Sequence, residues 1–233
     1  MKAIVLGTGI DRLGFLGFER KTISGPFGEA ECFIRDDLAL IPRHGKEHKV
    51  APHLINYRAN IDVMRSLGVD EAIALYAVGS ITDRLLPGEC GIVSDFIDMS
   101  HSRCNSFHDG TILPLRHEEM DAPFSSDLVN RVLALDPSLR RDLVYVTTQG
   151  PRLETKAEIT AYERLGADVV GMTLATEASL IRELGIRNCA LCYSINMAAG
   201  KGQEGMSFIG DEETERISSH LLHLAMEALV HVC

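Results

Sequence analysis

Several short apolar runs along the chain have the length and composition of buried β-strands. They are rich in Val, Ile, Leu and Ala, and most stop at a glycine or a small polar residue. Near-continuous apolar runs of this kind are typical of strands that are covered on both faces. The pattern therefore predicts strands at residues 3–6, 72–78, 91–97, 143–148, 168–172 and 189–195.

Segments with helical periodicity separate many of these strands. Pro52 suits a first helical turn and Gly68 a helix end, so the segment 53–67 is predicted to be helical. Thr155 and Glu158 have the spacing of a capping box, in which the two side chains satisfy backbone N–H groups at a helix start. Further helices are predicted at 125–135, at 176–185 and from 211 to about 232.

The alternation of strands and helices is the signature of an α/β domain, whose helices cover a mostly parallel or mixed sheet. The exception is the segment 98–123, which is polar, rich in histidine and without a clear period. A loop of that length inside a compact domain usually serves function or an interface. No linker divides the 233 residues, so one domain, 1–233, is expected.

The composition is that of a globular chain, with 45% hydrophobic and 24% charged residues. A net charge of −10 opposes non-specific binding to nucleic acid or to an anionic membrane surface. No apolar run approaches the roughly 20 residues that a membrane-spanning helix needs. The opening MKAIVLGTGI is too short and too interrupted by glycine for a signal peptide, and is expected to form the first strand.

The chain contains six scattered cysteines. Without an export signal, they are expected to be reduced thiols in a cytoplasmic protein. Cys189 and Cys192 form a C-x-x-C, but no second pair accompanies them and both fall within a predicted strand. We therefore expect small residues packed on a buried strand rather than metal ligands.

The stretch LGTGI at 6–10 follows the first predicted strand. A strand that runs into Gly-Thr-Gly can present backbone N–H groups and the Thr8 hydroxyl to a phosphate. A dinucleotide-binding fingerprint would need a third glycine where Arg12 stands, followed at once by a helix, so NAD binding is not expected. A plain turn is the alternative interpretation of this stretch.

A second candidate is the basic segment IPRHGKEHK at 41–49. Arg43 offers a planar fork suited to a phosphate, and His44 stands beside it. A metal site built from His44 and His48 would need a third ligand and a helix, which the neighbouring proline and glycine oppose, so no metal is expected. A solvated run of charges stays the alternative.

Three predicted strands end in small residues with a polar side chain among them, namely Ser80, Thr173 and Asn196. Ligands of open α/β sheets bind at the carboxyl ends of strands, so these side chains are candidates for one site. Each of them alone is more typical of a turn or a helix cap than of a site. Together with Thr8 and Arg43, they suit a phosphate and a small polar heterocycle.

Further motifs occur in order over nearly the whole chain: GTGI (7–10), PRHGKEH (42–48), NYRANI (56–61), AVGS (77–80), FHDG (107–110), QGPRLET (149–155), ADVVGMT (167–173) and SINMAAG (194–200). In this set the chain resembles the trimeric purine nucleoside phosphorylases, and within them the branch of 5′-methylthioadenosine and S-methyl-5′-thioinosine phosphorylases. The resemblance implies a single-domain, three-layer α/β/α fold with a central mixed β-sheet.

Members of this family split purine nucleosides with inorganic phosphate, which attacks C1′ of the sugar as the base leaves. Such a reaction needs positioning and charge complementarity rather than a protein nucleophile. The resemblance implies phosphate as co-substrate, no metal or organic cofactor, and a homotrimer with sites near subunit interfaces. It assigns phosphate binding to Thr8, Arg43, His44 and Thr173, and contact with the nucleoside to Tyr76, Ala77, Val78, Gly79 and Met172.

Glu154 stands one position too early for the capping box and, taken alone, is a first-turn acid favoured by the helix dipole. The resemblance gives it a sharper role, because members that take 6-oxopurines have Glu and Asn where this chain has Glu154 and Asn196. A carboxylate accepts a hydrogen bond from N1–H of hypoxanthine, whereas N1 of adenine has no hydrogen. Asn196 can serve O6 and the proton gained at N7, so these two are the expected catalytic residues.

Family members that bind a 5′-hydroxyl have a histidine just before the last helix. In that region this chain has Met206, Phe208 and Ile209 and no histidine. This apolar set suits a methylthio group, so S-methyl-5′-thioinosine is the expected nucleoside. His117, in the long loop, resembles the histidine that members of this branch lend to a neighbouring subunit's site. Leu153 departs from the family pattern, because many members have a phenylalanine there that stacks on the purine.

Alternatives stay open beside this interpretation. A nucleoside hydrolase would use water in place of phosphate. An adenine-type methylthioadenosine phosphorylase, or an inosine/guanosine phosphorylase, would run the same reaction on another nucleoside. A non-catalytic module would bind a nucleoside without releasing the base.

Overall fold

The computed structural model describes residues 1–9, 15, 17–45, 49–110, 113–202 and 207–230. Within these ranges the backbone forms one nine-stranded mixed sheet. Its strands are β1 (Lys2–Leu6), β2 (Glu19–Gly25), β3 (Gly28–Arg35), β4 (Leu38–Pro42), β5 (Glu71–Ser80), β6 (Cys90–Asp98), β7 (Arg140–Thr147), β8 (Val169–Gly171) and β9 (Arg187–Met197).

Part of the sheet closes on itself. The strand order is β2-β3-β4-β1-β5-β8-β7-β6-β9, and β9 also pairs with β5. Strands β5, β8, β7, β6 and β9 therefore form a closed ring, from which β1 and the strands beyond it extend as an open sheet. Strands β4, β1, β5 and β9 run parallel to one another, so their carboxyl ends meet at the same edge.

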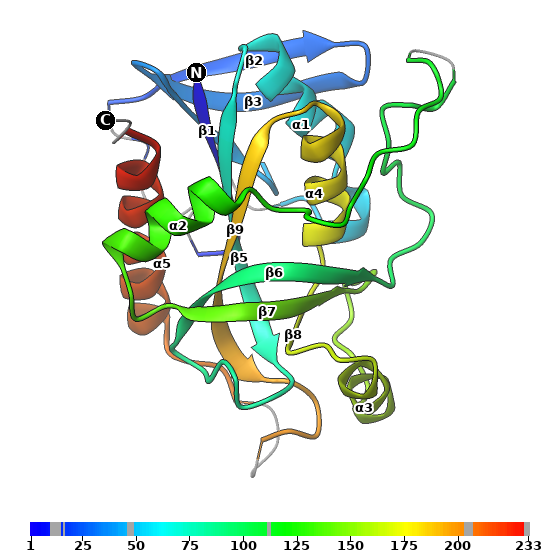
Figure 1. Cartoon of the computed structure of the whole chain (residues 1–233), viewed down its shortest axis with the longest axis vertical. Coiled ribbons are helices and arrows are strands. Elements are labelled where there is room, and N and C mark those ends of the chain that lie inside the picture. Colours follow the sequence, from blue (N-terminus) through cyan, green and yellow to red (C-terminus); the bar gives the residue numbers. More distant parts are fainter. Residues whose placement is uncertain (10–14, 16, 46–48, 111–112, 203–206, 231–233) are drawn as a thin grey trace.

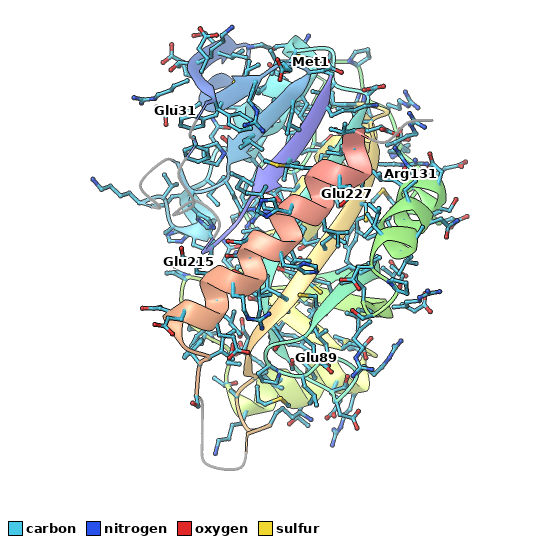
Figure 2. All side chains as sticks on the ribbon, turned by 90° about the vertical axis from the view of Figure 1, so that its left-hand side faces the viewer. Met1, Glu31, Glu89, Arg131, Glu215 and Glu227 are labelled. Carbon is cyan, nitrogen blue, oxygen red and sulfur yellow. The ribbon has the colours of Figure 1, made fainter. Side chains whose placement is uncertain are left out.

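The helices of the described ranges are α1 (Tyr57–Ser66), α2 (Ser126–Leu135), α3 (Lys156–Arg164), α4 (Leu174–Glu183) and α5 (Asp211–Val230). Helices α1 and α4 pack together on one face of the sheet, and α2 and α5 on the other (Figure 1). Figure 2 shows α5 crossing in front of the strands. This arrangement confirms the expected three-layer α/β/α fold.

Alternate side chains of the central strands enter two separate apolar cores, as the period of two in a strand demands. In β5, Ala74 and Tyr76 belong to the core under α1 and α4, whereas Ile73 and Leu75 belong to the core under α2 and α5. A smaller third cluster, which includes Ile159, lies under α3. None of the described helices has both the length and the apolar character that crossing a membrane requires.

Cys189 and Cys192 follow the same alternation on β9. Cys189 packs in the α2–α5 core and Cys192 in the α1–α4 core. Burial raises the pKa of Cys189 to about 12, so its thiol stays protonated. Two buried side chains on opposite faces of one strand cannot bind a single ion, which supports the expectation that this C-x-x-C is a packing feature.

Residues 19–42 hold three strands that the hydrophobic pattern did not predict. Strands β2 and β3 form a hairpin with Gly25 opposite Gly28, and β4 joins this hairpin to β1. Strand β2 has the sequence ERKTISG and is mostly exposed, because it is the edge strand. An edge strand with polar side chains lacks the apolar run by which the buried strands were found.

Helix α1 begins later than predicted from Pro52. The proline opens a separate 3-10 turn, and the Asn56 side chain then caps α1 by accepting a hydrogen bond from the Ala59 N–H over 3.1 Å. The capping box of α3 is confirmed, because Thr155 and Glu158 each bond to the other's backbone N–H. The described residues between β6 and α2 form no helix or strand, which confirms the long loop.

Candidate active site

A cavity of about 440 Å³ opens at the carboxyl ends of the parallel strands. Its wall takes residues that directly follow β1 and β4 and residues that end β5 and β9. Because these strands are parallel, side chains far apart in the sequence meet at one edge of the sheet. The wall includes the predicted site residues Thr8, Arg43, His44, Tyr76, Ala77, Val78, Gly79, Leu153, Glu154, Met172, Thr173, Asn196 and Phe208.

Arg43 is held at the buried end of this cavity by an ion pair with Glu177. Its Nε and Nη2 donate to the two carboxylate oxygens over 2.6 and 2.7 Å, and its Nη1 donates to the Leu75 carbonyl over 3.0 Å. The guanidinium carbon lies 4.4 Å from the centre of the Tyr76 ring, and the Tyr76 hydroxyl donates to Glu177 over 2.8 Å. All of these side chains are buried, so folding fixes the position of the cation.

The ion pair keeps this cluster charged and ordered. Burial opposes the charge of Arg43, but the attraction and the hydrogen bonds of Glu177 outweigh it and raise the pKa of the guanidinium. Burial and Glu177 also raise the pKa of Tyr76 far above its usual value. Within the described residues, Glu177 and Leu75 take three of the five N–H groups of Arg43, so at most two remain for an anion.

A glycine is required at position 7 by this arrangement. A Cβ there would lie 2.4 Å from Nη1 of Arg43 and 2.6 Å from the Leu75 carbonyl oxygen. In the Gly-Thr-Gly stretch, Gly7 thus makes room for the guanidinium, and Thr8 reaches the cavity wall. The end of the GTGI motif, Ile10, lies outside the described residues.

Two further polar residues frame the buried end. Thr173 is the N-cap residue of α4, and its side chain makes no capping hydrogen bond. His44 donates from Nδ1 to the Val50 carbonyl over 2.8 Å, which orients its ring. A helix N-terminus attracts anions, so a cation, a hydroxyl and a helix start together suit a phosphate. Lys46 and His48 of the same basic segment lie outside the described residues.

The opposite end of the cavity carries Glu154 and Asn196. Glu154 is half-buried on the wall, and its Oε1 accepts a hydrogen bond from the Thr148 hydroxyl over 2.6 Å. Asn196 is buried, and its Nδ2 donates to the Met197 carbonyl over 2.8 Å. A Cβ on Gly79 would lie 3.4 Å from the Asn196 Oδ1, so this amide lies beside the end of β5. A carboxylate and an amide therefore line the same cavity, as predicted.

Apolar side chains form the rim near this end. Leu153 is 47% exposed and Phe208 is 52% exposed, and both line the cavity. The backbone of Phe208 is held by an isolated bridge to Asn196, and the following N–H donates to the Ile195 carbonyl over 2.8 Å. Phe208 is thus attached to the carboxyl end of β9 without being buried.

Ile209 and His117, which were also predicted to contact the 5′ side, do not lie on the cavity wall. Ile209 packs against the α2–α5 core behind the site. His117 is exposed in the long loop, away from the cavity of its own chain. Met206 lies outside the described residues. Phe208 is therefore the part of the predicted apolar set that the structure places at the site.

A sequence model of the family described as Phosphorylase superfamily matches residues 2–231. The chain belongs to this superfamily. Its fold agrees with a solved structure of methylthioadenosine phosphorylase from Schistosoma mansoni in complex with adenine, with a TM-score of 0.88 and 23% identity. That alignment covers 98% of this chain and 90% of the other, and it concerns the fold alone.

Curated relatives of this phosphorylase-superfamily chain differ in the nucleoside that they are named for. A 6-oxopurine nucleoside phosphorylase of Pyrococcus furiosus is 37% identical over 85% of this chain and 80% of its own length. A probable S-methyl-5′-thioinosine phosphorylase of Methanocaldococcus jannaschii is 37% identical over 93% and 86%. An S-methyl-5′-thioadenosine phosphorylase of Nitrosopumilus maritimus is 38% identical over 81% and 73%.

Glu177 is the important site residue that the sequence interpretation missed. It is a single acid within the apolar stretch LATEASLI and is fully buried in α4, four positions after Thr173. A charge inside an apolar stretch signals a buried partner, although the sequence does not say which one. Among the described residues, no cluster of His, Cys, Asp or Glu could hold a metal ion. Other wall residues outside the predicted set are Lys49, Val50, Ala51, Pro52, Val170, Gly171, Ile195 and Ala198.

Proposed function

We propose that the chain is a pentosyltransferase that cleaves the N-glycosidic bond of a purine nucleoside with inorganic phosphate. The products are a free purine base and ribose 1-phosphate or its 5-methylthio analogue. One observation carries the proposal: a single cavity joins the buried Arg43 cluster at one end to the Glu154 and Asn196 side chains at the other. Membership of the phosphorylase superfamily and the names of the relatives support it.

In the proposed reaction, phosphate lies between Arg43 and the N-terminus of α4, with the hydroxyls of Thr8 and Thr173 and the His44 ring around it. A phosphate oxygen forms a bond to C1′ of the sugar while the C1′–N9 bond breaks, and the bonding electrons leave with the purine. The chain supplies positioning and charge complementarity and needs no cofactor. The leaving base takes up a proton from water at N7, and the Asn196 oxygen accepts the hydrogen bond from the resulting N7–H.

The preference for a 6-oxopurine rests on Glu154. Its carboxylate accepts a hydrogen bond from N1–H of hypoxanthine or guanine, whereas N1 of adenine would meet it lone pair to lone pair. A mispaired polar group of this kind costs about 1–3 kcal/mol, which corresponds to roughly 10- to 100-fold in kcat/KM. Relatives named as 6-oxopurine nucleoside phosphorylase and as probable S-methyl-5′-thioinosine phosphorylase support this preference.

A 5′-methylthio group is the substituent that fits the rim best. Phe208 and Ile195 offer apolar surface there, and an apolar lining favours a thioether over a hydroxyl. S-methyl-5′-thioinosine is therefore the proposed nucleoside. Inosine or guanosine is the alternative if the 5′ group is a hydroxyl. S-methyl-5′-thioadenosine is the alternative if the base is adenine, and one relative is named as a phosphorylase of that nucleoside.

The proposed assembly is a homotrimer with its sites near subunit interfaces. His117 is exposed and lies off the cavity of its own chain, which is compatible with a role in a neighbouring subunit's site. Light scattering after size exclusion tests the trimer, and a His117→Ala variant tests whether nucleoside KM rises while the trimer persists. A cytoplasmic location stays a prediction from the reduced cysteines.

The decisive experiment measures kcat/KM for S-methyl-5′-thioinosine, inosine, S-methyl-5′-thioadenosine and adenosine, each with and without phosphate. The four nucleosides combine two bases with two 5′ groups. The preference for the base is therefore measured once with each 5′ group, and the preference for the 5′ group once with each base. We expect turnover only with phosphate and the highest kcat/KM with S-methyl-5′-thioinosine. Glu154→Gln should lower kcat/KM for the two hypoxanthine nucleosides by about 10- to 100-fold and change the two adenine nucleosides much less.

Each alternative has its own result in this experiment. Turnover without phosphate identifies a hydrolase. Higher kcat/KM for both adenine nucleosides overturns the 6-oxopurine preference, and higher kcat/KM for inosine than for its methylthio analogue overturns the 5′ assignment. Tight nucleoside binding without base release identifies a binding module.

A further inference from the structure

The Thr148 hydroxyl holds the base-reading carboxylate from outside the nucleoside cavity. Thr148 follows β7 and is 6% exposed. Its Oγ1 lies 2.6 Å from Oε1 of Glu154 and 3.4 Å from the Gly171 carbonyl oxygen. A hydroxyl has one proton to donate, and the shorter, charge-assisted bond to the carboxylate takes it. Thr148 is not on the wall of the nucleoside cavity, so it acts on a ligand only through Glu154.

Glu154 needs this hydrogen bond from Thr148, called the tether below, because its side chain lies between two cavities. A second, polar cavity of about 360 Å³ lies behind it, and Thr148 and Glu154 both line that cavity. His101, Arg152, Glu158 and Tyr162 also line it. Arg152 pairs there with Glu158, so His101 and Tyr162 are the polar groups offered to a carboxylate that turns away from the base. The Glu154 carboxylate therefore has space and polar neighbours on the side away from the base as well, so packing alone does not fix its direction.

The tether is itself held in place by two strand ends and a loop. The Thr148 N–H donates to the Gly171 carbonyl over 2.8 Å, which links the ends of β7 and β8. The Thr148 carbonyl accepts from Nη2 of Arg103 over 3.1 Å. Arg103 also donates to the carbonyls of Gln149 and Met172 over 2.8 and 2.7 Å. The threonine therefore cannot follow the carboxylate if that side chain turns.

We propose that Thr148 is a specificity-determining positioning residue for the purine base. By occupying Oε1, it sets Glu154 so that Oε2 receives N1–H of a 6-oxopurine. This inference rests on the proposed function and deepens it. Without the hydroxyl, the carboxylate turns toward the second cavity, so hypoxanthine nucleosides lose an acceptor and adenine nucleosides lose an unfavourable contact. The ratio of kcat/KM for hypoxanthine nucleosides to that for adenine nucleosides then falls, because the first value decreases and the second increases.

The test is the ratio of kcat/KM for S-methyl-5′-thioinosine to that for S-methyl-5′-thioadenosine. Thr148→Val keeps the shape of the side chain and removes the donor. We expect the ratio to fall about tenfold, because the lost hydrogen bond is to a charged group. Thr148→Ser keeps the donor and should restore the ratio to within about threefold of wild type. KM for phosphate should stay unchanged in both variants, because the Arg43 end of the cavity is not touched.

A matched control is available in Thr82, which also donates its hydroxyl to a carboxylate, that of Asp168, over 3.1 Å. Thr82 is not on the wall of either cavity, so Thr82→Val should leave the ratio unchanged. A double-mutant cycle adds a second check. In a Glu154→Ala background, Thr148→Val should no longer change the ratio, because the side-chain acceptor that Thr148 positions is gone.

The outcomes separate this inference from the function on which it rests. A wild-type preference for the adenine nucleoside overturns both. A wild-type preference for the hypoxanthine nucleoside that Thr148→Val leaves intact, or that Thr148→Ser fails to rescue, overturns the role of Thr148 alone. An equal loss for both nucleosides with a lower Tm also overturns it, because that is the result of a merely structural residue. If the valine variant does not fold, Thr148→Ala must give the same fall in the ratio.

Discussion

The two ends of the cavity are built in opposite ways. At the phosphate end, Arg43 and Thr173 are 3% and 6% exposed, and Glu177 behind them is fully buried. At the base end, Glu154 is half-buried, and the rim residues Leu153 and Phe208 are about half exposed. Asn196 at the base end is also buried and Thr8 at the phosphate end is exposed, so the contrast lies between the buried Arg43–Glu177 pair and the half-buried Glu154 with its exposed rim.

This difference has a physical reason. A cation can be buried only with a partner, and Glu177 supplies the partner before any phosphate arrives. In the proposed reaction, the base end binds neutral hydrogen-bonding groups, so it needs no buried charge compensation. Folding therefore fixes the Arg43–Glu177 pair, whereas in the proposed site substitutions at Glu154 or the rim can alter the nucleoside with little cost to the fold. Relatives that are 37–38% identical to this chain are named for different nucleosides.

Glu177→Leu should give the largest effect, because it leaves the buried Arg43 cation without its partner. We expect a loss of about 3–5 kcal/mol in the free energy of unfolding, measured by urea denaturation. The double variant Arg43→Met/Glu177→Leu replaces the pair by apolar side chains and should recover most of that stability without recovering phosphorolysis. A loss below about 1 kcal/mol in the single variant would show that the ion pair does not hold the buried end together.

Thr173→Val should affect phosphate and spare the fold. The Thr173 side chain makes no capping hydrogen bond to α4, so the helix does not depend on its hydroxyl. Loss of a hydrogen bond to the dianion should raise KM for phosphate about tenfold and leave the ratio of hypoxanthine to adenine nucleosides unchanged. Thr155→Val is the matched control: its hydroxyl does cap α3, so it should lower the free energy of unfolding by about 1 kcal/mol without raising KM for phosphate. A changed base preference in Thr173→Val would break the separation of the two ends.

The sequence also predicted these two ends unequally. Thr173 and Asn196 were found because polar residues at the ends of apolar strands meet at one edge of a parallel sheet, but Ser80, chosen by the same rule, is buried against Ser194 and is not on the cavity wall. That rule depends on local pattern alone. The pairing of Arg43 with Glu177 spans more than half the chain, and no spacing rule connects two single charges at such a distance.

The same limit explains the errors in the fold. Strands β1, β5, β6, β7, β8 and β9 and the capping box at Thr155 are local signals and were predicted, but the buried strand β4 was missed. Strand β2 was missed because its exposed edge position removes the apolar run. The closure of β9 onto β5 and β6 depends on register between strands far apart in the sequence, which the hydrophobic period does not contain. The hydrogen bond from Thr148 to Glu154 was also missed. Thr147 and Thr148 are adjacent at a strand end, and the sequence does not show which of the two hydroxyls points toward Glu154.

Leu153→Phe tests whether the rim at the base end lies outside the folded core. A ring at this exposed rim position can stack on the purine, so KM for the nucleoside should fall about two- to fivefold, which corresponds to roughly 0.5–1 kcal/mol. The free energy of unfolding should change by less than about 0.5 kcal/mol, because the position is exposed. Leu165→Phe, on an exposed leucine after α3 and off the cavity, is the control that should leave KM unchanged. A large loss of stability in Leu153→Phe would mean that the rim belongs to the core after all.

The smallest effect is expected at the helix start beside the base end, where Glu158 pairs with Arg152. Hydrogen bonds from the Arg152 side chain and from the Thr155 backbone lower the pKa of Glu158 from 4.5 to about 2. The folded state therefore binds this proton less readily than the unfolded state, so the contribution to stability is present above pH 4.5 and is lost as the pH falls toward 2. Solvent screens this exposed pair, so Glu158→Gln should lower the urea midpoint near pH 7 by no more than roughly a few tenths of a molar. Its curve should converge with that of wild type toward pH 2, and the selectivity for the base should stay unchanged. A difference that grows as the pH falls would contradict the assigned direction of the shift, and a changed base preference would mean that Arg152 and Glu158, and not Thr148 alone, govern the orientation of Glu154.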